Sequence, residues 1–340
     1  MVWFCYNGFF QQNQNPQFQR SAATSLGLQV VIGDITCRLI WPDQSMSWII
    51  ITLFAQAIFA VVTLVDRFMV STPAINKPAV YVFYNNILLL IVIGLLPFGV
   101  VIKPTPELIE LSLLTGIALT FSLLFLYRAL KISEASDVAP VFAAVAAIVS
   151  FGLSPIFLLE GLAGNILLGF ILLVFGTLVM SYFRFTKRSL VYVCLAGCLS
   201  AFSLVFLKTI FSQTSFWNGI FWASLGSVAG VLLFLIAPSN RKNLRENLKQ
   251  SPMGIKAVVI LNKAMAGFAY FLVLYAVKLG SVPVVNALGG AQFVFLLFLA
   301  LVLSREFPKY FRETTEAGEV LKKSIATAII MVGLALLFAG

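Results

Sequence analysis

The stretch from Tyr127 to Glu160, YRALKISEASDVAPVFAAVAAIVSFGLSPIFLLE, decides the fold, because a later stretch repeats its order of parts. That later stretch, Leu274 to Glu306, reads LYAVKLGSVPVVNALGGAQFVFLLFLALVLSRE. In each of them an apolar helix ends in an Ala-x-Lys step, a short polar break follows, and a second apolar segment ends at a glutamate. A chain that contains this order twice is predicted to consist of two similar halves.

The composition predicts that both halves lie in a membrane. Of the 340 residues, 60% are hydrophobic and only 11% are charged. A water-soluble fold of this length has no core large enough for so much apolar surface, and the charged faces of a soluble barrel or Rossmann sheet are missing. We therefore expect an all-α integral membrane protein.

Apolar segments of membrane-spanning length, about 20 residues, recur from Ser47 onward. Prolines, glycines and short polar runs separate them. The loop that contains Lys187 and Arg188 divides them into five plus five. The ten predicted transmembrane helices have the approximate spans 48–70, 79–102, 108–130, 137–159, 164–183, 190–211, 215–237, 256–278, 281–303 and 324–340.

The distribution of Lys and Arg predicts the orientation of these helices. The even-numbered connections hold only Lys103, Lys208 and Lys278, whereas the odd-numbered connections hold most of the others. The positive-inside rule then places the odd connections in the cytoplasm. Because five is an odd number, the second half enters the membrane in the opposite sense, which makes the halves inverted repeats. The basic run from Asn240 to Gln250 has an alternative interpretation as an interfacial helix.

Residues 1–45 differ from the rest, because they are polar and rich in glutamine. We expect them to be a poorly ordered extension, with Met46 as the natural start of the protein. A flexible tail that binds a partner is the alternative. The two repeats are then expected at 46–186 and 187–340.

Several short motifs resemble a known family when they are taken in order. They are Arg128-Ala129-Leu130-Lys131, Ala139-Pro140, Glu160, Ala276-Val277-Lys278 and Glu306. Their order and spacing over about residues 47–340 resemble the EamA-like domain of the drug/metabolite transporter superfamily, present twice. The resemblance implies a ten-helix secondary transporter that moves a small metabolite, amino acid or drug-like compound by alternating access through a cavity between the repeats.

The chain departs from this family at two places. Family members often carry a basic residue early in the second helix, where this chain has Asn85-Asn86, and Ala287 replaces the proline of Ala139-Pro140 in the second copy. Both departures leave the substrate class open.

Polar residues in the middle of membrane helices are candidate site residues, because a buried polar group in hydrocarbon costs free energy unless it is paired. Lys263, Gly267 and Tyr270 share one helix face, and we expect them to hold an anionic group such as a carboxylate. Alternatively, the ammonium group of Lys263 reaches back to the membrane interface about 10 Å away. The amide side chains of Asn85 and Asn86 would then form hydrogen bonds between packed helices. The predicted substrate-binding residues are Gln56, Tyr84, Asn85, Asn86, Asn262, Lys263, Tyr270 and Asn286.

Charged residues near helix ends form a second set of candidates. One interpretation is that they fix the helix ends at the interface. The other is that a carboxylate pairs with a base in one state of the transport cycle and acts as a gate. Because the chain has no histidine, Asp66 or Glu160 would carry any coupling proton. The predicted gate or coupling residues are Asp66, Arg67, Glu160, Lys208 and Glu306.

Other classes of protein fit the sequence less well. The four cysteines lack metal-ligand spacing, so we expect no metal, and no motif indicates a cofactor or binding of nucleic acid. A passive channel would need a continuous polar stripe, and an intramembrane lipid-modifying enzyme would need paired carboxylates or a His-rich motif. We expect a multi-pass transporter, not an enzyme, in the inner or plasma membrane, with the bilayer and a small-molecule substrate as partners. The sequence is also compatible with a homodimer.

Overall fold

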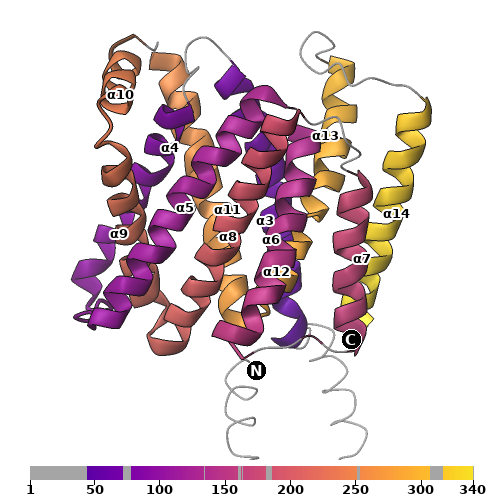
Figure 1. Cartoon of the computed structure of the whole chain (residues 1–340), viewed down its shortest axis with the longest axis horizontal. Coiled ribbons are helices and arrows are strands. Elements are labelled where there is room, and N and C mark those ends of the chain that lie inside the picture. The colour runs from indigo at the N-terminus through magenta and orange to yellow at the C-terminus, as the bar shows by residue number, and fades with distance from the viewer. Residues whose placement is uncertain are drawn as a thin grey trace, which may run out of the picture. The chain divides into compact units, whose positions relative to one another are not determined.

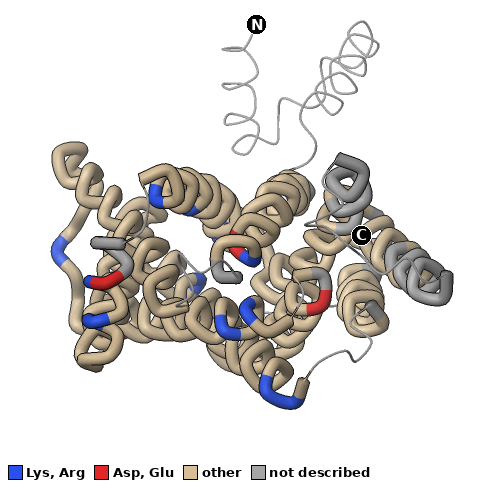
Figure 2. The backbone as a smooth tube through the Cα atoms, turned by 90° about the horizontal axis from the view of Figure 1, so that it is seen from above, with Lys and Arg blue, Asp and Glu red and all other residues tan. Residues whose placement is uncertain are grey.

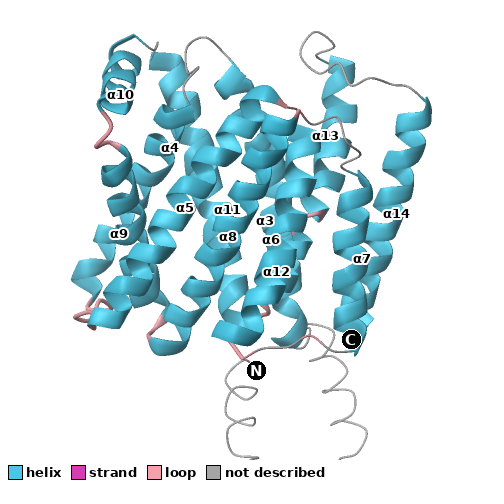
Figure 3. Cartoon of the chain, viewed as in Figure 1, coloured by secondary structure: helices cyan, strands magenta, loops and turns pink. Residues whose placement is uncertain are grey.

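The computed structural model describes residues 44–71, 78–133, 135–159, 162, 164–180, 186–250, 253–306 and 317–339. Every regular element within these ranges is a helix, as Figure 3 shows. Of the expected N-terminal extension, residues 1–45, the structure describes only Gln44 and Ser45, with which the first helix begins. Contacts group the residues from Trp48 to Gly340 into one compact unit.

The helices follow the predicted segments closely, and several begin where the sequence supplies a cap. The side chains of Thr105, Thr186 and Ser215 each accept a hydrogen bond from a backbone amide three residues later. The elements in Figure 1 are α3 (Gln44–Ser71), α4 (Pro78–Ile87), η3 (Leu88–Phe98), α5 (Pro106–Ile132), α6 (Ala135–Phe157), α7 (Gly164–Met180), α8 (Lys187–Gln213), α9 (Phe216–Phe234), α10 (Pro238–Gln250), α11 (Met253–Leu279), α12 (Val282–Leu288), α13 (Ala291–Glu306) and α14 (Ala317–Ala339).

Seven of these helical stretches are long and apolar enough to cross a membrane, and three shorter apolar helices accompany them. Large apolar side chains also face outward, such as Ile91, which is 84% exposed, and Phe98, which is 75% exposed. Such a surface suits lipid and not water. Charged residues form only short coloured segments when the helices are viewed end-on (Figure 2). The fold is that of a multi-pass membrane protein.

Two predicted helices are divided in the structure. The segment expected at 79–102 begins as α4 and continues as the 3-10 helix η3, which ends at Gly99 with a φ of +66°. The segment expected at 281–303 breaks at Gly289 and Gly290 into α12 and α13. A Cβ atom at Gly290 would overlap the side chain of Thr177 on α7, so this close approach requires a residue without a side chain.

Small residues bring helices α5 and α9 into direct backbone contact. A Cβ atom at Gly116 would overlap the backbone of Gly226 and Ser227, and one at Gly226 would overlap the backbone carbonyl of Ser112. The Gly226-x-x-x-Gly230 pattern on α9 therefore permits close packing of the two helices. This crossing joins a helix from the first half of the chain to one from the second.

Candidate functional site

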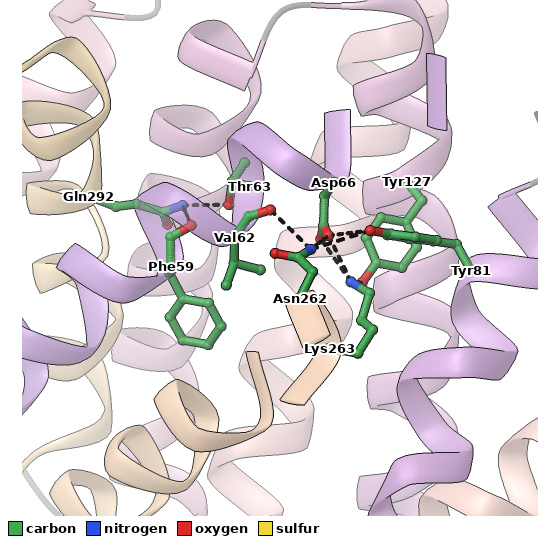
Figure 4. A network of polar contacts seen from close by, with 9 residues as sticks. All are labelled: Phe59, Val62, Thr63, Asp66, Tyr81, Tyr127, Asn262, Lys263 and Gln292. Atoms are coloured by element: carbon green, nitrogen blue, oxygen red, sulfur yellow. Dashed lines mark hydrogen bonds and ion pairs between the residues drawn. The ribbon is translucent and has the colours of Figure 1, made fainter. Parts of the chain in front are cut away.

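A buried ion pair joins α3 to α11. The Nζ atom of Lys263 lies 2.9 Å from both carboxylate oxygens of Asp66 (Figure 4). The side chain of Lys263 is 1% exposed and that of Asp66 is 7% exposed. Among the residues that the structure describes, these two are the only charged ones that are buried. The interpretation in which Lys263 reaches back to the interface is therefore wrong, because a carboxylate lies buried beside it.

Two neutral donors complete the surroundings of the carboxylate. The hydroxyl group of Tyr81 on α4 donates a hydrogen bond of 2.7 Å to Oδ1 of Asp66. The Nδ2 atom of Asn262, the residue before Lys263, donates to the same oxygen. With the ammonium group of Lys263, three side chains therefore donate to one carboxylate, which compensates the loss of its hydration.

The ammonium group is equally well surrounded. The Nζ atom of Lys263 donates to the hydroxyl oxygen of Tyr127 on α5 over 2.8 Å. It also lies 4.0 Å from the centroid of the Tyr81 ring and 4.8 Å from that of Tyr127. The two rings meet edge to face with centroids 4.9 Å apart. Both faces attract a cation through the ring quadrupole, so Lys263 has partners besides Asp66.

We call Asp66, Tyr81, Tyr127, Asn262 and Lys263 the charged network. It links α3, α4 and α5 to α11, as Figure 4 shows. Of its members, the sequence predicted Asn262 and Lys263 as binding residues and Asp66 as a gate, but not that they meet. Tyr81 and Tyr127 were missed. Tyr127 opens the repeated stretch that predicted the fold, yet a tyrosine in an apolar helix is equally typical of packing.

Two other predicted gate residues bind the carboxyl ends of helices. Arg67 on α3 donates from Nη1 to the carbonyl oxygen of Ser133 over 3.0 Å, just after α5. Lys208 on α8 donates to the carbonyl oxygens of Val277 and Gly280, at 2.8 Å and 2.9 Å, where α11 ends. A cation is favourable at this position because the last carbonyl groups of a helix lack partners within it. Both contacts fix a helix end, as one of the two interpretations expected.

The predicted amides form contacts between helices at separate places. Asn286 donates to the hydroxyl group of Ser150 on α6 over 3.0 Å. Asn86 accepts from the Thr120 hydroxyl group on α5 over 3.3 Å. The structure brings neither into the charged network. Gln56 is buried and Asn85 is half-buried, and no hydrogen bond within the described ranges joins either one to that network.

A small pocket contains Tyr270, one of the predicted binding residues. Residues of η3, α5, α8, α9 and α11 line this pocket. Its wall includes Thr115, which is 2% exposed and whose hydroxyl group has no hydrogen-bond partner among the described residues. Sequence reasoning missed Thr115, since a threonine in a membrane helix usually bonds its own backbone. The lining residues are Leu89, Thr115, Leu119, Leu207, Ile220, Ala223, Ser224, Ser227, Tyr270 and Leu274.

The remaining candidates lie outside what the structure describes. Glu160 is not among the described residues, and neither is the side chain of Glu306, although α13 ends at that residue. In the part of the chain that is described, no group of three or more His, Cys, Asp or Glu residues is arranged to hold a metal ion.

Two tyrosines one turn apart on α4 make a matched pair for mutagenesis. We expect Tyr81→Phe to lower the free energy of unfolding by about 1–3 kcal/mol, because Asp66 loses a charge-assisted hydrogen bond. The hydroxyl group of Tyr84 is buried without a partner in the described part of the chain. Tyr84→Phe should therefore leave the free energy of unfolding unchanged or raise it. Thermal unfolding in detergent measures both, and an equal loss for the two variants would contradict the assignment.

Comparison with known proteins identifies a fold but no family. No protein-family model matches the chain. No curated protein matches its sequence. Among solved structures 26 chains match, and one crystal structure aligns with a TM-score of 0.55 over 86% of this chain and 95% of the other. The two sequences are 18% identical, so the likeness concerns the fold alone.

Proposed function

We propose that this protein is a secondary transporter that moves a small metabolite or drug-like compound across the inner or plasma membrane by alternating access. The observation that carries the proposal is the buried pair of Asp66 and Lys263. Charged side chains inside a membrane protein are costly and commonly mark transport pathways. Here the pair connects α3 in the first half to α11 in the second, so movement between the halves would break or form it.

The contacts of Arg67 and Lys208 support a division into two equivalent halves. In each case a cation on one predicted span binds the carboxyl end of the second predicted span that follows it, at a carbonyl group two residues after the lysine of the repeated Ala-x-Lys step. Equivalent contacts are expected if 46–186 and 187–340 are repeats. In the proposed topology the seven long and three shorter apolar helices make ten spans, with α4 and η3 together as the second and α12 and α13 as the ninth.

The break between α12 and α13 also suits a transporter. Discontinuous helices recur near the substrate sites of transporters. Asn286 lies in the last turn before this break and binds Ser150 on α6. Under the proposed topology, this contact lies between the fourth helix of each half, and the charged network is a gate near the cytoplasmic ends of α3 and α11.

Transport is tested with purified protein in proteoliposomes. Candidate substrates are first selected by thermal stabilisation from a panel of amino acids, nucleosides, sugars and cationic drugs. A radiolabelled hit should then accumulate inside vesicles preloaded with the unlabelled compound, and Lys263→Met should abolish this counterflow. Ion conductance without accumulation of any compound would favour a passive channel and exclude the transporter.

The inverted topology has its own test. Single cysteines at Lys242 on α10 and at Lys278 at the end of α11, both exposed positions, should react from opposite sides of the membrane. The background for this experiment is a protein without its four natural cysteines. A membrane-impermeant maleimide applied to intact cells should label the position at 278 but not that at 242. Labelling of both positions from one side would contradict the arrangement.

A further inference from the structure

We infer that Lys263 exchanges Asp66 for the carboxylate of an anionic substrate while Asp66 takes up a proton, so that one anion and one proton move together. This inference rests on the proposed function and names the substrate class and the coupling ion. It follows from three features of the charged network: its charge balance, the surroundings of Lys263, and the absence of a second such pair at the equivalent place in the other half.

Charge balance limits how the pair can open. While Asp66 and Lys263 are in contact, the network is neutral. Separating them leaves a carboxylate and an ammonium group, each buried without its counter-ion, which is far too costly in an apolar interior. A proton neutralises Asp66, and an anion neutralises Lys263. The total charge of the site is therefore the same before and after the exchange.

The cage around Lys263 remains when Asp66 leaves. The hydroxyl group of Tyr127 and the faces of both tyrosine rings contact the ammonium group without using Asp66. Asn262 and Tyr81 donate to the carboxylate of Asp66, so the same donors are available to the carboxylate of a substrate. The site is thus a preformed carboxylate site that Asp66 occupies in the described state.

The proton has one evident acceptor in this site. The titratable and charged groups around Asp66 are Lys263 on α11, Tyr81 on α4, Tyr127 on α5 and the neighbouring Arg67 on its own helix, whose guanidinium group binds the end of α5. The tyrosines are already neutral, and the two bases are already cations. Asp66 is the one member whose protonation removes a charge, and protonation also weakens its attraction for Lys263.

The exchange can occur at only one end of the protein. If Arg67 corresponds to Lys208, then Asp66 corresponds to Leu207. If Ala129 corresponds to Ala276, then Lys263 corresponds to Gly116. The place in the other half that corresponds to the ion pair therefore holds two uncharged residues, Leu207 and Gly116. Gly116 packs directly on α9. In this inference the ion pair closes the site towards one side of the membrane, and close helix packing closes it towards the other.

Binding to the purified protein in detergent tests the inference without requiring transport. The probes are two matched acid and amide pairs, nicotinate with nicotinamide and acetate with acetamide, at constant chloride concentration. The acids should bind and the amides should not. Their affinity should rise up to about tenfold for each unit by which the pH falls from 8 towards 5.5, because binding takes up one proton. Calorimetry in buffers of different ionisation enthalpy should show about one proton bound per nicotinate.

Variants separate the two roles. Asp66→Asn mimics the protonated residue, so it should bind nicotinate at pH 8 as tightly as at pH 5.5 and take up no proton. Lys263→Met should bind neither acid. If Asp66→Asn does not fold, the measurement of proton uptake by the unmodified protein still tests the inference.

Equal binding of acids and amides, or anion binding without proton uptake, would overturn the inference while leaving transport of another substrate intact. Coupled binding without counterflow would instead contradict the proposed function.

Discussion

Replacing Lys263 with methionine is expected to lower the free energy of unfolding by about 3–5 kcal/mol, the largest effect of any single change in the charged network. The substitution keeps the length and apolar stem of the side chain but leaves the carboxylate of Asp66 buried with two neutral donors. Asp66→Asn should cost less, because Lys263 keeps Tyr127 and the two ring faces. Thermal and denaturant unfolding in detergent would measure both changes.

The double variant Asp66→Asn/Lys263→Met is the control. It removes both charges, so its stability should recover to near that of the unmodified protein, since the cost of the single change comes from the unpaired charge. Substrate exchange should not recover. If the two losses simply added, the side chains would not act as a pair, and the gate would lose its basis.

Gly116→Ala is expected to have a comparable effect for a different reason. The added Cβ atom would overlap the backbone of Gly226 and Ser227, and a helix backbone cannot move aside as a flexible side chain can. Helices α5 and α9 must separate, which we expect to cost at least about 3 kcal/mol or to prevent folding. Yield of monodisperse protein and thermal unfolding would show the loss.

Gly152→Ala on α6 is the matched control for this change. Beyond its own stretch of helix backbone, no atom of the described residues lies within 4 Å of the added Cβ position, so only the helix propensity changes. We expect Gly152→Ala to be neutral or to stabilise the protein by up to about 1 kcal/mol. A similar loss at both positions would mean that glycine itself, and not the close crossing of α5 and α9, matters at position 116.

The helices were predictable from the sequence, but two of their interruptions were not. Runs of apolar residues between prolines and polar steps located the α5, α6 and α8 segments to within a few residues, because crossing hydrocarbon requires a minimum apolar length. The division at Gly289 was missed because glycines are common within membrane helices. At the neighbouring Gly290 the approach of Thr177 from α7 makes a glycine necessary, and Thr177 lies over a hundred residues away in the chain.

The candidate site was predictable only in part. Asn262 and Lys263 were expected to bind ligand because polar groups in hydrocarbon need partners. Asp66 was expected at a helix end, and its burial against Lys263 depends on how α3 packs beside α11. The sequence by itself determined a helical membrane chain with a repeated pattern, because hydropathy and helix-breaking residues act locally. Only the tertiary structure decided which charges meet, because the partner of a buried charge is whichever group the folded helices place within a few ångströms of it.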